Sequence, residues 1–233
     1  MKLYEDFYSY NTNHYHTIYH INTLLKLWKE YRKDFLVEYP NLNEDALIEA
    51  IKWHDSYYVP GEKDNEYLSI KLYADNVKMI DPLVCLIIES TKIGYENLNF
   101  MDELKVMHDL DWSGFNDYEV FKANCEKICA EAIDVGKFDQ FIVRRNQIDF
   151  YRKFAEKPLY LTKTFSKFND IAKENMLRLA DELENTYFCK KSIFDCTGMF
   201  QNMQPQITIA NEENLLKHLK DLANNDKGDK NDQ

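Results

Sequence analysis

The placement of histidines is the feature of this 233-residue chain that could carry chemistry. The histidines in its first 54 residues are His14, His16, His20 and His54. Asp55 follows the last of these directly, and an Asp-Leu-Asp sequence occupies 109–111. Imidazole and carboxylate groups together are suitable ligands for Mn, Fe, Co, Ni or Zn. These residues could therefore bind a divalent metal.

A metal site needs ligands that converge from separate elements. An adjacent His54-Asp55 pair near a helix end can supply two ligands, and a distant histidine and aspartate would complete the set. Water and a phosphate oxygen would take the remaining coordination positions. A metal ion makes bound water easier to deprotonate, so this water could act as a nucleophile at neutral pH. In the alternative interpretation, His54 complements a helix C-terminus and Asp55 is solvated. The dipeptide alone leaves both interpretations open.

The elements that must position these residues are expected to be helices, because apolar residues recur at gaps of three and four. The ranges predicted to be helical are 15–35, 43–57, 64–77, 81–92, 100–111, 117–133, 139–155 and 165–187. His16 and His20 are four residues apart, so on a helix they would project from one face. Asp109 and Asp111 are two residues apart on a helix, so only one of them would reach an ion.

The composition favours an all-α fold, since 6 Gly and 5 Pro are few for a turn-rich β protein. We predict one helical bundle over 1–187 and a C-terminal extension over 188–233. The extension is expected to be partly disordered, with a short helix over 211–223. The net charge of -11 argues against duplex nucleic acid as a partner. A small anionic substrate remains compatible, because a bound metal inverts the local potential.

The five cysteines form no Cys-x-x-Cys pair, so we expect reduced thiols and a cytoplasmic location. No apolar h-region is visible in the first residues, which predicts no signal peptide. No apolar run approaches 18 residues, so no membrane span is expected.

The sequence around the histidines resembles the predicted metal-dependent HD phosphohydrolases. The resemblance covers about residues 5–185. The matching stretches, in order, are Asn13-His14-Tyr15-His16-Thr17 with His20-Ile21, Trp53-His54-Asp55 with Tyr58, Pro60-Gly61 with Asp64-Asn65-Glu66 and Ser69, Ile88 to Lys92, Asp109-Leu110-Asp111, and then Arg144-Arg145, Leu159-Tyr160 and Asn175. The first three stretches are specific in combination.

The resemblance implies a helical HD-type fold and a set of metal ligands. His20 would be the first ligand, His54 and Asp55 the central pair, and Asp111 the last, with Asp109 as the competing choice. The cofactor would be one divalent ion, chosen among Mn, Co, Ni, Fe, Zn and Mg.

Further residues are candidates for catalysis and substrate binding. Asp55 and Glu66 are the catalytic candidates, and Glu66 could act as a general acid or base or simply cap a helix. His16 could face the substrate or make a hydrogen bond behind the ligands. Lys92 and the pair Arg144–Arg145 could bind phosphate, although solvated arginines are the commoner case.

One position departs from the family pattern. The family often has a histidine three residues after the threonine that corresponds to Thr91, and here that position is Gly94. A site with a single metal is therefore favoured over a dinuclear one. The segment after 188 has no counterpart in the resemblance.

The resemblance implies a phosphohydrolase that cleaves a phosphoester in a nucleotide or another small phosphorylated metabolite. The alternative is a non-catalytic protein of the same fold that binds a phosphorylated ligand or a protein partner. A metal-dependent oxygenase is a third reading, for which His108 would be the spare ligand near the downstream aspartates. Neither the substrate nor the oligomeric state follows from the residues.

Overall fold

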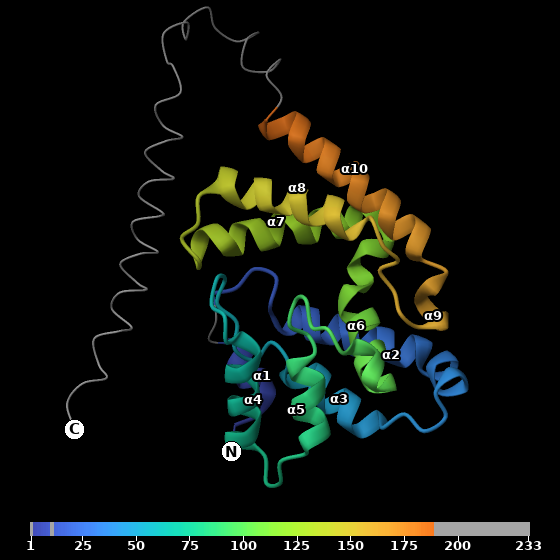
Figure 1. Cartoon of the computed structure of the whole chain (residues 1–233). Helices are drawn as coiled ribbons and strands as arrows, with labels where there is room; N and C mark the ends of the chain where they lie inside the picture. The colour runs from blue at the N-terminus through green and yellow to red at the C-terminus, as the bar shows by residue number, and fades with distance from the viewer. Residues whose placement is uncertain (1, 10–11, 189–233) are drawn as a thin grey trace, which may run out of the picture. The chain divides into compact units, whose positions relative to one another are not determined.

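A computed structural model describes residues 2–9 and 12–188, and the described part of the chain contains helices and no strands (Figure 1). The all-α prediction is therefore confirmed. The described residues form one compact unit. The extension predicted over 188–233, including the helix over 211–223, lies outside the described residues except for Phe188.

The helices lie close to the predicted ranges. They are α1 Tyr4–Ser9, α2 Ile18–Glu38, α3 Glu44–Trp53, α4 Asn65–Asn76, α5 Pro82–Glu89, α6 Asp102–Asp111, α7 Tyr118–Asp134, α8 Gln140–Phe154, α9 Lys163–Ser166 and α10 Asn169–Tyr187, with the 3₁₀ helices η1 Leu98–Phe100 and η2 Trp112–Asn116. No described helix is both long enough and apolar enough to cross a membrane.

Short polar side chains begin many of these helices. Asn43 accepts a hydrogen bond from the backbone nitrogen of Ala46 at 3.1 Å and thereby begins α3. Asp117 and Asp139 begin α7 and α8 in the same way. Such caps satisfy N–H groups that the first helical turn leaves without partners. The three capping residues stand at 43, 117 and 139, where the predicted ranges begin.

Two predicted boundaries were wrong near the histidines. The helix predicted from 15 begins at Ile18, after an extended Thr17, so His16 precedes α2 instead of sharing a helical face with His20. The helix predicted over 43–57 ends at Trp53, with His54 as its C-terminal cap. Both ligand segments therefore lie where a helix meets a loop, and periodicity is least informative at such positions.

The core joins α2, α3, α5 and α6. Fully buried apolar side chains from these helices include Ile21, Phe35, Leu47, Ile51, Ile87, Leu104 and Leu110. Helix α2 contacts both α3 and α6, so the first histidine-bearing helix lies against the two elements that carry the other predicted ligands. Burial of this apolar face fixes the relative positions of the three ligand-bearing segments.

A second group of helices consists of α7, α8 and α10. Helices α7 and α8 lie side by side, and α10 packs along α8 (Figure 1). The 3₁₀ helix η2, which directly follows α6, contacts both α7 and α10. The end of α6 is therefore the place where the ligand-bearing helices and this second group meet.

Candidate metal centre

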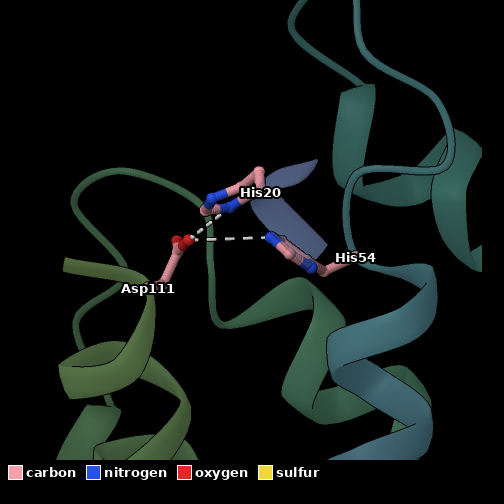
Figure 2. A group of neighbouring side chains, drawn as sticks. All are labelled: His20, His54 and Asp111. Atoms are coloured by element: carbon pink, nitrogen blue, oxygen red, sulfur yellow. Dashed lines mark hydrogen bonds and ion pairs between the residues drawn. The ribbon is translucent and has the colours of Figure 1, made fainter. Parts of the chain in front are cut away.

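Three side chains from separate helices converge at the ends of their elements (Figure 2). His20 lies in the first turn of α2, His54 caps α3, and Asp111 is the last residue of α6. One ligand atom from each lies within 4.8 Å of the others, so the group could hold a metal ion. Figure 2 shows both imidazole rings turned toward the carboxylate of Asp111.

Asp55 belongs to the same cluster. Its Oδ2 lies 3.0 Å from Nε2 of His54 and 3.5 Å from Nε2 of His20. Oδ1 of Asp111 lies 3.0 Å from Nε2 of His20 and 3.6 Å from Nε2 of His54. The structure thus brings together the four residues that the sequence suggested as ligands.

The environment of His54 prepares one ring nitrogen for a ligand. Its Nδ1 lies 3.0 Å from the carbonyl oxygen of Ile51, which can only accept, so Nδ1 carries a proton. Nε2 faces the cluster and lies 3.0 Å from Oδ2 of Asp55, so it would bind a metal ion only after giving up its proton. This atom is buried, and the second carboxylate, that of Asp111, lies 3.6 Å from it. Metal-binding histidines commonly have their second nitrogen held in this way.

The charges of the cluster suit a divalent cation. Burial lowers the pKa of His54, but Asp55 and Asp111 outweigh burial and raise it well above the ordinary value, so the two carboxylates favour a positive charge at this position. Burial raises the pKa of Asp55, but the neighbouring His54 and His16 outweigh burial and lower it. Burial likewise opposes the ionised form of Asp111, and its contacts with His20 and His54 keep its pKa below the ordinary range. Both aspartates are therefore ionised ligands.

His16 lies next to this cluster and is held by a glutamate that the sequence analysis did not identify. Its Nδ1 is 2.5 Å from Oε1 of Glu131, and its ring stacks on Tyr58 with centroids 3.4 Å apart. Burial lowers the pKa of His16, but Asp55 and Glu131 outweigh burial and raise it. Nδ1 of His16 bonds to Glu131, which is not one of the suggested ligands, and His16 also lines the cavity described below.

Glu131 fastens the whole segment that leads to His20. Its Oε2 accepts hydrogen bonds from the backbone nitrogens of His14, Tyr15 and His16 at 2.9–3.1 Å. The side chain is 1% exposed. A signal was available in the sequence, because Glu131 continues the apolar stripe of Phe121 and Ile128 on α7. A glutamate at a buried helical position needs a partner.

Asp109 has a different role from Asp111. Asp109, the competing choice for the last ligand, is fully buried and is not among the groups that converge with His20 and His54. It accepts hydrogen bonds from the backbone nitrogens of Leu161 and Thr162, at 2.9 and 2.8 Å, and from the Thr162 hydroxyl at 2.6 Å. Burial nevertheless raises its pKa to about 6. Asp109 therefore anchors the segment before α9.

A cavity of about 470 Å³ opens onto the cluster. His16, His20, Asp55 and Asp111 line it at one end, together with the catalytic candidate Glu66. Burial raises the pKa of Glu66, so this carboxyl group takes up a proton more readily than an exposed glutamate. Glu66 is thus placed where it could exchange a proton with a bound molecule.

The three basic residues suggested as phosphate ligands do not line this cavity. Lys92 is exposed, and its Nζ lies 3.3 Å from the carbonyl oxygen of Lys63. Arg144 is buried and bonded to Glu126 and to Gln147, which fixes it between α7 and α8.

The remaining candidates are also engaged elsewhere. Arg145 pairs with Glu184 on α10, 3.4 Å away. Nε2 of His108 donates to the carbonyl oxygen of Leu159 at 3.0 Å, so this histidine, suggested as a spare ligand, serves the packing of α6.

A second cavity, of about 500 Å³, also borders the cluster. It shares His20 and Asp111 with the first cavity, and its own lining includes Thr23, Ser113 and Lys127. Its described lining is more polar than that of the first cavity. His20 and Asp111 therefore border both cavities.

No family model matches this chain, and no match appears among curated proteins or solved structures.

Proposed function

We propose that this protein is a metal-dependent phosphohydrolase of the HD type that cleaves a phosphoester in a small molecule. The observation that carries the proposal is the convergence of His20, His54, Asp55 and Asp111 at one end of a cavity large enough for a small molecule. The buried Nε2 of His54, which faces Asp55 and Asp111, and the two carboxylates themselves fit a divalent ion. The mixed nitrogen and oxygen ligands favour Mn, Fe, Co, Ni or Zn over Mg.

The four ligands would hold the ion, and the ion would supply Lewis acidity that neutralises phosphate charge and eases deprotonation of water. His54 is oriented for this task by Ile51, and the charges of Asp55 and Asp111 balance the cation. Because the ligands come from three packed helices, their geometry is set before a substrate binds. Such preorganisation is the main contribution of a protein to phosphoryl transfer.

Two residues beside the ligands would handle charge and protons. His16, whose proton on Nδ1 faces Glu131, supplies positive charge for a phosphate oxygen in the cavity. Glu66 accepts a proton from the attacking water or returns one to the leaving oxygen, because its pKa is raised by burial.

The test is release of inorganic phosphate from a panel of phosphomonoesters and nucleotides, with Mn, Co, Ni, Fe, Zn or Mg added singly. We expect turnover that disappears after treatment with a chelator and returns when metal is restored. Absence of turnover across the panel, in protein that binds one metal ion, would favour the alternative function as a non-catalytic binding protein.

A further inference from the structure

The cavity that opens onto the ligands continues into an apolar wall. The side chains of this wall come from η2, α7 and α8 and are Phe115, Phe121, Ile128, Ile142, Phe150 and Tyr151. A single phosphate group beside the ligands would fill a minor part of the 470 Å³. The larger part of the cavity would therefore contact the organic group attached to the phosphate. The surface that it offers to this group is aromatic and aliphatic.

The charges of the lining restrict the ligand further. Within the described part of the chain, no lysine or arginine lines this cavity, whereas the carboxylates of Asp55, Glu66 and Asp111 do. A di- or triphosphate would bring several negative charges into this acidic surrounding, with little besides the metal and His16 to offset them. A ligand with one phosphate group and an uncharged remainder suits the lining better.

The apolar wall also reaches the loop that follows the ligand pair. Phe138, in the turn between α7 and α8, packs against Gly61, where an added Cβ would lie 2.5 Å from the Cζ atom of the ring. Gly61 has a φ of 85°, a left-handed conformation that glycine adopts readily. The ring of Phe138 thus joins the α7–α8 turn to the loop after Asp55, which extends the apolar enclosure toward the metal centre.

We propose that the substrate is a phosphomonoester whose organic part is apolar, an alkyl or aryl group that occupies the wall formed by η2, α7 and α8. The phosphate would lie at His20, Asp55 and Asp111, and the organic group would extend toward Ile128 and Ile142. The proposal rests on the proposed function only in taking the metal centre as the place of the phosphate.

The test is a comparison of dissociation constants for ethylphosphonate and hexylphosphonate, measured by calorimetry on the full chain loaded with Mn²⁺. Phosphonates are not hydrolysed, so binding is measured whether or not the protein is an enzyme. Each buried methylene strengthens binding by up to about fourfold, the equivalent of about 0.8 kcal/mol. We expect hexylphosphonate to bind at least about tenfold more tightly, allowing for incomplete burial of four added methylenes.

A matched pair of variants separates this wall from general surface effects. Ile142 is 56% exposed and lines the cavity, whereas Ile171 is 45% exposed on α10 and does not line it. Ile142→Asp should reduce the preference for the hexyl chain by at least about threefold, since a carboxylate in the wall opposes apolar burial. Ile171→Asp should leave the preference as in the parent protein.

Equal affinity for the two phosphonates, or equal losses in the two variants, would overturn the apolar subsite. Equal affinity is also the result expected if the organic group enters the more polar cavity beside Lys127. Tighter binding of hexylphosphonate without turnover of any phosphoester would contradict the proposed hydrolase function and support the apolar subsite. Turnover of phosphoesters with no preference for chain length would contradict only the apolar subsite.

Discussion

Two aspartates at the end of α6, Asp109 and Asp111, lie in different regions of the molecule. The two regions differ in the groups that contact the carboxylates. Asp109 accepts three hydrogen bonds from Leu161 and Thr162, so the protein itself saturates it. Asp111 instead faces the imidazoles of His20 and His54, beside a second carboxylate. A buried aspartate whose donors are all supplied by the protein fastens segments together. Carboxylates gathered beside imidazole nitrogens are arranged for a cation.

The largest effect is expected when a metal ligand is removed. Asp55→Ala or Asp111→Ala should lower metal-dependent phosphoester turnover by at least about a hundredfold, because loss of a ligand misplaces the reacting groups. Neither side chain belongs to the apolar core, so the helical circular dichroism spectrum should be retained. Turnover and metal content, measured on the same samples, provide the check. Full metal content with unchanged turnover in Asp55→Ala would remove Asp55 from the ligand set.

The second prediction concerns Asp109, the aspartate with a structural role. Asp109→Ala should lower the free energy of unfolding by about 3 kcal/mol, because two backbone N–H groups and a hydroxyl lose their acceptor in a buried setting. Its metal stoichiometry should stay at that of the parent protein. Denaturant unfolding and metal analysis give the two measurements. If Asp109→Ala lost the metal and Asp111→Ala kept it, the roles of the two aspartates would be exchanged.

Metal addition sharpens the contrast. A divalent ion at one hundred times its dissociation constant should stabilise the parent protein by about 2.7 kcal/mol, because it binds the folded state. The same concentration should stabilise Asp109→Asn by a similar amount and leave Asp111→Asn nearly unchanged. Thermal denaturation with and without metal tests this. Equal stabilisation of the two variants would show that the ion binds elsewhere.

Glu131 offers a smaller test, which depends on pH. Burial raises its pKa, but the hydrogen bonds from His16 and the backbone outweigh burial and lower it. A carboxyl group with a lowered folded-state pKa stabilises the protein above its unfolded-state pKa and loses that contribution as pH falls through the folded-state value.

Glu131→Gln should therefore destabilise the protein by about 2 kcal/mol at pH 7, where charge-assisted hydrogen bonds are lost. The difference from the parent should shrink below about pH 4, the ordinary range of a glutamate. Denaturant unfolding at several pH values measures it. A difference that stays constant with pH would mean that the charge of Glu131 contributes nothing.

The sequence by itself determined the helices and the residue types of the site. Helix starts followed from capping residues such as Asn43, whose hydrogen bonds are local, and apolar periodicity marked the buried faces. The set of His20, His54, Asp55 and Asp111 was also within reach, because the motifs around these residues resemble a family in which such residues bind metal. Caps, periodicity and motifs all depend on residues that are close together in the sequence, so they can be recognised without the fold.

What the tertiary structure decided was the role of each polar residue that depends on a distant partner. Asp109 meets Thr162, His16 meets Glu131, and Arg144 lies buried between α7 and α8, all across long separations in the chain. Helix α7 packs against η2, and Phe150 and Tyr151 of α8 contact the rings of η2, which likewise created the apolar part of the cavity. These contacts form only when whole helices pack, because a side chain's spacing fixes its face but not the segment that covers that face.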